Sequence, residues 1–249
     1  MNEVEAFGYI WNKRGQCFMK MTGNTILITG GATGIGYALA EKFLALGNEV
    51  IICGRRERKL KEAQNKHPYL HIFTCDVADS KDRERLLDWV VAEFPSLNIL
   101  INNAGIQRDI DFNKGMEDLI SGQNEISINL EAPIYLTALF FKQLENKENS
   151  AIVNVSSGLA FWPMPAVPIY CATKIALHTY TMLLRQQLLK TGIKVFEIIP
   201  PAVESELNIE GRKNRGLGIK LVSAAKFVEV VVKGFEKDEF EIKYEMTQK

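Results

Sequence analysis

A phenol and an ammonium group lie four residues apart at Tyr170 and Lys174, in a stretch predicted to be helical. Side chains at this spacing share one face of a helix. A ketone that accepts a hydride becomes an alkoxide, which requires a proton donor beside its oxygen. An ammonium ~5 Å from a phenol favours the phenolate by about 3 kcal/mol, or about two pKa units, at an effective dielectric constant of ~20. The pair therefore predicts Tyr170 as a general acid and base whose pKa Lys174 lowers.

The spacing of this pair is weak evidence by itself, because Tyr9 and Lys13 are also four residues apart without such a context. Two further residues support the second pair. Ser157 lies thirteen residues before Tyr170, after a predicted strand, where its hydroxyl can donate to a substrate oxygen. Asn129 lies at a predicted helical junction. Taken singly, the four could be a packed aromatic ring, a solvated helix charge, a strand-end cap and a helix-junction cap.

A glycine-rich turn lies near the amino end of the chain. The run Thr25–Thr29 is typical of a buried parallel strand, and a helical pattern resumes at Tyr37. In the turn, Gly30 allows a sharp bend, Gly34 leaves room for phosphate oxygens, and Gly36 lets the helix pack closely. The unpaired N–H groups of a helix N-terminus attract anions. The predicted phosphate-binding residues are Gly30, Thr33, Gly34, Ile35 and Gly36. A tight turn that binds nothing is the alternative.

Strand-like and helix-like segments alternate along the rest of the chain. Further strands are predicted over 50–53, 71–75, 98–101, 151–155, 194–199 and 240–244, and helices over 57–66, 79–94, 116–128, from 132, 169–190 and 224–236. Strands joined by helices are parallel, with right-handed crossovers. The pattern predicts a single-domain Rossmann-type α/β fold, a doubly wound parallel sheet of about seven strands with helices on both faces.

Unusual residues follow the carboxyl ends of six predicted strands: Gly30, Arg55, Asp76, Asn102, Ser157 and Pro201. These ends meet at one edge of a parallel sheet, which is where such sheets bind ligands. We therefore expect one site at this edge.

The end of the second strand indicates which dinucleotide binds. An acidic residue there usually binds the adenosine ribose hydroxyls, but this chain has Gly54 followed by Arg55 and Arg56. Guanidinium groups can bind a 2′-phosphate through charge-assisted hydrogen bonds, whereas a carboxylate would repel it. The sequence therefore favours NADP over NAD. In the alternative, the arginines only begin a solvated helix.

Together, these features resemble the short-chain dehydrogenase/reductase family over roughly residues 23–244. The glycines follow its Gly-x-x-x-Gly-x-Gly spacing, and its catalytic tetrad is matched by Asn129, Ser157, Tyr170 and Lys174. The resemblance implies that Asn129 anchors a water between Lys174 and solvent, and that Lys174 also binds the nicotinamide ribose. Within the family, the chain is similar to bacterial oxidoreductases associated with cell-envelope teichoic-acid operons.

Further matches to the family concern the adenosine half of the cofactor. Asp76 and Val77 match residues near the adenine, and Asn102 and Ala104 belong to an Asn-Asn-Ala-Gly motif beside the adenosine ribose. Thr33 stands where some NADP-preferring relatives have a second basic residue. Taken alone, Asp76 or Asn102 could be a loop residue that satisfies its own backbone.

The segment after the sixth strand matches the family in part. The family has Pro-Gly-x-Val-x-Thr there, which contacts the nicotinamide carboxamide. Val203 and Ser205 keep that pattern, but Pro201 replaces the glycine and removes an N–H group. The resemblance therefore implies cofactor contacts at Val203 and Ser205 and an altered local backbone.

Composition excludes several classes of partner. Lysine plus arginine and aspartate plus glutamate number 30 each, so no global field attracts nucleic acid or an anionic membrane. The four cysteines show no C-x-x-C spacing, the three histidines are too scattered for a metal site, and no apolar run is long enough to span a membrane. A cytoplasmic protein without a metal is expected, with residues 1–22 as a flexible extension before a domain over 23–249.

Two segments bear on the substrate. Residues 159–168 are almost wholly apolar and should line the pocket, which predicts a small apolar substrate, unless this loop packs against another subunit. Residues 206–221 lie where the family has a mobile lid. The resemblance implies a homodimer or homotetramer formed through the helices around Ala132 and Tyr170. Reduction of a 3-oxoacyl group on a carrier protein and non-catalytic dinucleotide sensing are the alternatives, although a sensor needs no Tyr170.

Overall fold

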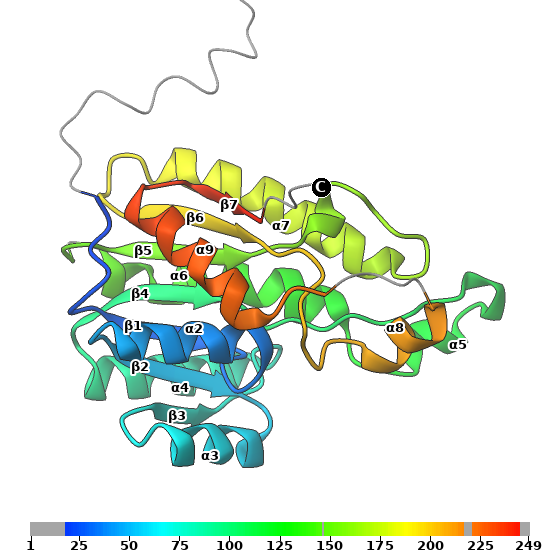
Figure 1. The fold of residues 1–249 in the computed structure, drawn as a ribbon, viewed down its shortest axis with the longest axis horizontal. Helices are drawn as coiled ribbons and strands as arrows, with labels where there is room; N and C mark the ends of the chain where they lie inside the picture. Colours follow the sequence, from blue (N-terminus) through cyan, green and yellow to red (C-terminus); the bar gives the residue numbers. More distant parts are fainter. Residues whose placement is uncertain (1–17, 146, 217–220, 245–249) are drawn as a thin grey trace, which may run out of the picture.

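The computed structural model describes residues 18–145, 147–216 and 221–244. Its centre is one parallel sheet in the order β3-β2-β1-β4-β5-β6-β7 (Figure 1). The strands are β1 (Thr25–Thr29), β2 (Glu49–Gly54), β3 (His71–Thr74), β4 (Leu97–Asn102), β5 (Ala151–Val155), β6 (Lys194–Ile199) and β7 (Glu241–Lys243). The predicted doubly wound sheet of seven strands is confirmed.

Helices cover both faces of the sheet. One face carries α2 (Gly34–Ala45), α3 (Glu57–Lys66) and α9 (Ala224–Glu236), and the other carries α4 (Ser80–Glu93), α6 (Ala132–Leu144) and α7 (Pro168–Gln187). Successive strand side chains point to opposite faces. Accordingly, Ile26 and Ile28 pack with α2 and α9, whereas Leu27 packs with the α4, α6 and α7 layer. This double burial explains why β1 reads as an unbroken apolar run.

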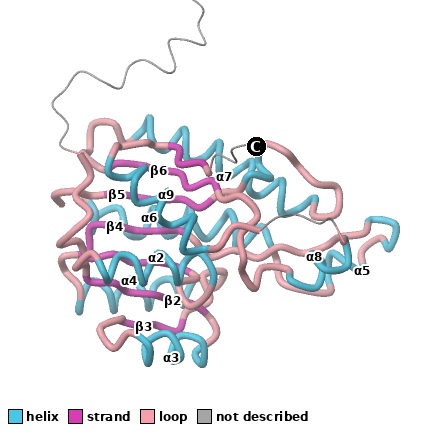
Figure 2. The backbone as a smooth tube through the Cα atoms, viewed as in Figure 1, coloured by secondary structure: helices cyan, strands magenta, loops and turns pink. Residues whose placement is uncertain are grey.

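The register aligns the carboxyl ends of the strands. Thr29 of β1 lies opposite Cys53 of β2, and Val155 of β5 lies opposite Ile198 of β6. The connections that leave these ends lie on the side where α5 (Glu117–Ile120) and α8 (Ile209–Arg215) project, and they are mostly loops (Figure 2). The sheet thus brings the residues that follow its strands to one edge.

The prediction that every crossover is right-handed is wrong at the last connection. The path from β1 through α2 to β2 moves toward one edge of the sheet, whereas the path from β6 through α9 to β7 moves toward the other. Since α2 and α9 cover the same face and pack together, the two crossovers have opposite hands. The handedness rule describes compact βαβ units. The last connection is not such a compact unit, because the chain passes through α8 before it reaches α9 and β7.

The predicted helical region over 116–128 is interrupted. The structure is helical in the single turn α5 and again from Glu125, but residues 121–124 are not helical. The Arg108 guanidinium donates to three carbonyl oxygens around the break, those of Asp118, Leu119 and Gln123. A Cβ at Gly122 would lie 2.8 Å from Arg108 Nε. Glycine is a poor helix former, and Arg108 satisfies carbonyls that a continued helix would have used.

The helical path resumes at Glu125 and passes through a π-helical turn, η2 (Ser127–Glu131), before α6. Such turns insert one extra residue into a helix and often occur at functional sites. Two short 3-10 turns complete the described elements, η1 (Phe112–Lys114) and η3 (Gly158–Ala160). The predicted junction at Asn129 is therefore this π turn.

Ordered packing begins before the predicted boundary at residue 22. Met19 is buried in the core on the α2 and α9 face, and Lys20 N donates to Asn149 Oδ1 at 2.8 Å. Residues 1–17, which include most of the predicted extension and Cys17, lie outside the described residues, as do residues 217–220 of the predicted lid. Cys53, Cys75 and Cys171 are free and buried, as expected for small apolar side chains.

Candidate active site

The glycine-rich turn that follows β1 is held by backbone contacts. Gly30 has φ +64° and Gly34 has φ +59°, a region that L side chains rarely adopt. Gly30 N donates to the Cys53 carbonyl at 2.8 Å, which ties the turn to the end of β2. A Cβ at Gly34 would lie 3.1 Å from Ser205 Cβ, so the segment after β6 passes directly over the turn.

Asn103 fastens the same turn to the end of β4. Its side-chain nitrogen donates to the carbonyls of Thr29 at 2.9 Å and Gly30 at 3.1 Å. A Cβ at Gly36 would lie 2.4 Å from that nitrogen and 2.5 Å from the Gly30 carbonyl oxygen. The close approach predicted at Gly36 is thus an approach to Asn103 and the turn. The Asn-Asn-Ala-Gly motif includes Asn103, but the sequence did not predict that its amide bridges β4 and the turn after β1.

The amino end of α2 has the features of an anion site. Thr33 is the N-cap residue, yet its side chain makes no hydrogen bond to the first helical turn. Uncapped N–H groups and the helix dipole favour a negative group at this place. Thr33 Oγ1 instead accepts a hydrogen bond from Arg56 at 3.1 Å, and Ile35 packs partly against the core.

Arg56 joins two segments at this anion site. Its guanidinium forms an ion pair of 2.5 Å with Glu206, from the predicted lid. Lys59 Nζ lies 3.2 Å from the other oxygen of Glu206, and the two cations lower the pKa of that carboxyl. Arg55 is paired with Asp76 at 4.0 Å. The predicted basic cluster therefore exists, and a carboxylate of the same chain occupies part of it.

The other adenosine-side candidates take up different positions. Asp76 accepts a hydrogen bond from Ala78 N at 3.0 Å and remains partly exposed, whereas the Val77 side chain is buried in the core. Ala104 N donates to Thr29 Oγ1, and its Cα would lie 2.8 Å from a Cβ at Gly30.

The Asn102 side chain does not lie at the edge where it was predicted to contact a ribose. It is 2% exposed and donates to Asn154 Oδ1 at 2.9 Å inside the sheet layer. As a strand residue, Asn102 alternates with its neighbours, and its amide faces the helices instead of the loop. The amide therefore bridges β4 and β5.

Ser157 and Tyr170 meet beyond β5. The Ser157 hydroxyl lies near enough to the Tyr170 phenol to lower its pKa, and its oxygen accepts a hydrogen bond from Leu159 N at 3.1 Å. Both residues are largely buried. Ser157 thus caps η3, in keeping with the capping role that the sequence offered as an alternative, and it also lies beside the phenol. Val167 and Cys171 pack around Tyr170 with Leu159 and Met164 at their edge.

Lys174 lies one helical turn beyond Tyr170 on α7. Its Nζ donates to the Val155 carbonyl at 2.8 Å and lies 5.7 Å from the centroid of the Tyr170 ring. Burial lowers the pKa of Lys174 to about 8, while the negative charge of Glu197 opposes this fall. The ammonium remains the main form at neutral pH.

The predicted fall in the Tyr170 pKa is not found. Burial raises the pKa of this phenol to about 12, the Ser157 hydroxyl opposes the rise, and the charges of Cys171 and Glu125 add to it. Removing a phenol from water disfavours its charged form more strongly than an ammonium above the ring favours it. The phenol therefore carries its proton throughout the neutral range.

Asn129 holds the loop that enters the site from β4. Its Oδ1 accepts from Ile106 N and its Nδ2 donates to the Ile106 carbonyl, each at 2.9 Å. Thr173 Oγ1 accepts a further hydrogen bond from Nδ2 at 3.2 Å. A Cβ at Gly105 would lie 3.3 Å from Asn129 Oδ1 and 3.6 Å from Lys174 Nζ. The four predicted catalytic residues thus belong to one site at the carboxyl edge of the sheet.

A family model described as short chain dehydrogenase matches residues 24–216. This chain belongs to the short-chain dehydrogenase family. It is 48% identical over 230 residues to the uncharacterized oxidoreductase DltE of Bacillus subtilis (strain 168), covering 92% of this chain and 91% of that protein. Short-chain dehydrogenases are NAD(P)-dependent oxidoreductases, and this chain is one of them.

Solved structures of similar fold contain either dinucleotide. The closed form of serine dehydrogenase complexed with NADP+ has a TM-score of 0.74 and 25% identity, with 84% of this chain and 88% of that chain covered. A short-chain dehydrogenase/reductase from Burkholderia phymatum in complex with NAD has a TM-score of 0.78 and 19% identity, with 91% and 90% covered. The fold comparison therefore leaves both cofactors open.

In this short-chain dehydrogenase, the segment after β6 is fastened beside the glycine turn. Val203 forms a bridge with Val222, and Arg212 donates to the carbonyls of Val203 and Ser205. Arg215 forms an ion pair with Asp109 from the loop after β4. Arg212 and Arg215 therefore fasten the segment after β6 to other parts of the same chain.

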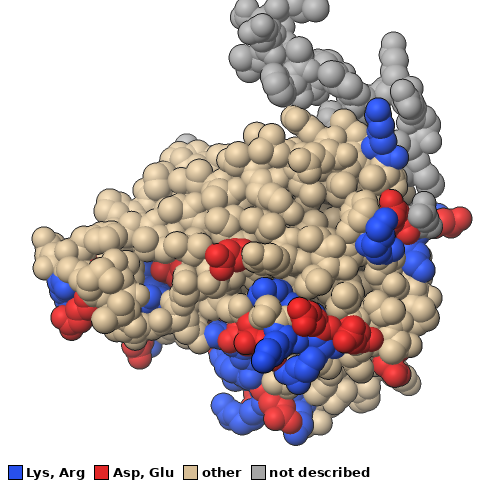
Figure 3. Space-filling model, turned by 180° about the vertical axis from the view of Figure 1, so that it is seen from behind, with Lys and Arg blue, Asp and Glu red and all other residues tan. Residues whose placement is uncertain are grey.

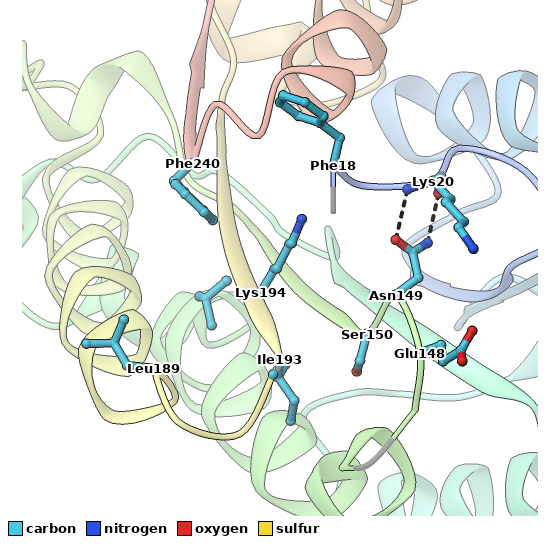
Figure 4. A pocket seen from close by; sticks show the side chains of 11 residues that line it. Phe18, Lys20, Glu148, Asn149, Ser150, Leu189, Ile193, Lys194 and Phe240 are labelled. Carbon is cyan, nitrogen blue, oxygen red and sulfur yellow. Dashed lines mark hydrogen bonds between the residues drawn. The ribbon is translucent and has the colours of Figure 1, made fainter. Parts of the chain in front are cut away.

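A cavity of about 340 Å³ lies away from this site (Figure 4). It opens at the amino ends of the strands, between residue 18, the start of β6 and the approach to β7. Asn149 beside it exchanges two hydrogen bonds of 2.8 Å with the backbone of Lys20. The cavity thus belongs to the edge opposite the catalytic residues.

Within residues 18–145, 147–216 and 221–244, no group of histidine, cysteine, aspartate and glutamate side chains is arranged to hold a metal ion. Nor does any helix in that part of this short-chain dehydrogenase have the length and apolar character needed to cross a membrane.

Proposed function

We propose that this enzyme reduces the carbonyl group of a small, largely apolar substrate with NADPH, and that Tyr170 donates the proton. The observation that carries the proposal is the meeting of three groups beside the glycine turn. A protonated phenol, a serine hydroxyl beside it and a buried ammonium converge at the carboxyl edge of the sheet.

The turn and its surroundings fit a dinucleotide. Gly30 and Gly34 have positive φ, and the first turn of α2 has no side-chain cap, so its N–H groups suit a pyrophosphate. The nicotinamide supplies the hydride when NADPH is bound. Lys174, which the family resemblance assigns to the nicotinamide ribose, keeps its ammonium beside the phenol.

The roles of the site residues follow from their contacts. Ser157 donates a hydrogen bond to the carbonyl oxygen and stabilises the negative charge that develops there. Tyr170 gives its proton to the same oxygen. The Lys174 ammonium stabilises the phenolate that remains, and the Val155 carbonyl fixes its position. Asn129 keeps the loop around Ile106 in place at the side of Lys174.

The raised pKa of Tyr170 sets the form in which its phenol meets a substrate. A pKa of about 12 keeps the phenol protonated, which is the form that a general acid needs. Oxidation of an alcohol would require the phenolate instead.

The basic cluster at the end of β2 supports NADP as the cofactor. Gly54 replaces the carboxylate that would bind ribose hydroxyls, and Arg56 and Lys59 already hold an anion, the Glu206 carboxylate. A 2′-phosphate can replace this carboxylate between the same cations. Ser205 and Val203, next to Glu206, lie close enough to the turn to contact the cofactor.

Apolar side chains around the phenol support an apolar substrate. Leu159 and Met164 from the segment after β5, together with Leu207 from the lid, pack on the cluster that contains Tyr170.

The alternative of an acyl-carrier partner requires a free basic surface at the pocket mouth. Arg212 and Arg215 are instead bonded to carbonyls and to Asp109. We therefore favour a free small molecule as the substrate.

A homodimer or homotetramer is supported by the surface of α6 and α7. The face that carries these helices shows few charged side chains over a broad area (Figure 3). Exposed apolar side chains on it include Tyr135, Ile175, Met182 and Leu183. Patches of this kind commonly mark interfaces.

The free, buried thiols agree with a reducing cytoplasm.

The test follows NADPH absorbance with a panel of ketones, aldehydes and diketones. Wild type should turn over at least one compound, and Tyr170→Phe should lower kcat by about 10²–10⁴-fold because the general acid is lost. NADPH binding, measured by fluorescence, should survive in the variant. Equal turnover by the two proteins would exclude Tyr170 as the proton donor, and NADPH binding without any turnover would favour a sensor.

A further inference from the structure

Glu125 is a buried carboxylate that the proposed reduction does not use. It is 2% exposed and stands at the start of the helical path that leads into η2. Its Oε1 accepts a hydrogen bond from Arg108 N at 3.1 Å. Its Oε2 is buried and has no hydrogen-bond partner among the described residues. A buried polar atom without a partner is destabilising and calls for a reason.

Glu125 lies beside the segment that leads from β4 toward the catalytic residues. It lies four residues before Asn129, so the two side chains share a helical face. Both fasten the segment after β4, Asn129 through Ile106 and Glu125 through Arg108. This segment begins at Gly105, next to Lys174 Nζ. The charge of Glu125 is also felt at Tyr170, whose pKa it raises.

No side chain among the described residues forms an ion pair or a hydrogen bond with Glu125. The Arg108 guanidinium donates to backbone carbonyls, and only the Arg108 backbone donates to Glu125. Burial raises the pKa of Glu125, and this hydrogen bond and the charge of Arg108 oppose the rise. Leu159, Met164 and Leu207 pack against the cluster that contains Tyr170. In apolar surroundings of this kind, a few placed polar groups determine which ligand binds.

We propose that Glu125 binds the substrate, its Oε2 accepting a hydrogen bond from a hydroxyl or amino group that the substrate carries close to its carbonyl. This inference rests on the proposed reductase activity and narrows the substrate class to hydroxy- or amino-carbonyl compounds. A substrate without such a donor leaves Oε2 unpaired, which a polar site penalises strongly.

The test compares three ketones of similar size: hydroxyacetone, aminoacetone and butanone. Wild type should show a kcat/KM for one or both donor-bearing ketones at least about tenfold above that for butanone, as one charge-assisted hydrogen bond provides. A preference for aminoacetone alone would identify an ammonium as the donor, and a preference for both would identify any hydroxyl or amino group.

Glu125→Gln should remove this preference. The variant keeps an oxygen for Arg108 N but places an amide N–H group where Oε2 accepted, so the ratio of kcat/KM values should fall toward one. A purely structural role for Glu125 would leave the ratio unchanged. Glu131→Gln, the same substitution at an exposed position of the same helical path, should keep the wild-type ratio.

An unchanged ratio in Glu125→Gln, or a wild type that prefers butanone, would overturn the inference while leaving the reductase proposal intact. Absence of turnover with every carbonyl, although NADPH binds, would remove the reductase proposal itself and this inference with it.

Discussion

The cofactor side and the substrate side of the catalytic edge are held together in different ways. On the cofactor side, the shape of the turn depends on the absence of side chains at Gly30, Gly34 and Gly36. On the substrate side, the Arg108 side chain binds backbone carbonyls around α5. Close packing at the glycines, with the Asn103 amide, fixes the first region, and the hydrogen bonds of a flexible arginine fix the second.

This difference suits two ligands of different kinds. A dinucleotide phosphate always has the same shape, so a turn that permits only one backbone path is sufficient. A region held by side chains can alter its contacts without changing the sheet beneath it. Substitutions on the cofactor side should therefore change the free energy of unfolding, whereas those on the substrate side should change ligand binding.

Matched glycine substitutions give the largest expected contrast. Gly36→Ala places a Cβ 2.5 Å from the Gly30 backbone oxygen, which cannot move freely. We expect it to lower the free energy of unfolding by about 2–3 kcal/mol, as overpacking does. Gly122→Ala meets the flexible Arg108 side chain at 2.8 Å and should change stability by less than about 0.5 kcal/mol. Urea unfolding measures both, and equal losses would contradict the comparison.

A smaller effect is expected where the two sides meet, at the contact of Arg56 with Glu206. Glu206→Gln removes the carboxylate that competes with a 2′-phosphate for Arg56 and Lys59. Since exposed ion pairs contribute about 0.5–1 kcal/mol, NADPH should bind about twofold to fivefold more tightly, with NADH unchanged. Fluorescence titration with each dinucleotide measures this. Tighter binding of NADH by the same factor would show that Glu206 does not face the 2′-phosphate.

The sequence predicted the cofactor side better than the substrate side. The β1 strand and the glycine turn depend on local residue types, and the bounds predicted for α3, α9, β5 and β6 agree with the structure. Around residue 120, the expected helix is broken where Arg108 binds carbonyls ten and fifteen residues further along the chain, and local periodicity cannot predict such a contact.

The sequence predicted which of these side chains come together, but not their electrostatics. The spacing of Tyr170 and Lys174 predicted that they share one face of a helix. The pKa of Tyr170 is raised instead of lowered because Val167 and Cys171 pack around the phenol and bury it, and sequence spacing does not show this packing. Asn102 shows the same limit. Its place at a strand end was correct, but alternation within the strand turned its amide toward Asn154.

The pH dependence of carbonyl reduction tests the central claim, a protonated phenol beside a buried ammonium, most directly. Lys174, with a pKa of about 8, is charged below that pH and loses its proton above it, while Tyr170, with a pKa of about 12, stays protonated. The value of kcat/KM should therefore be constant through neutral pH and fall above about pH 8 as the ammonium is lost. A value that rises through pH 8, or stays constant up to about pH 10, would contradict the claim.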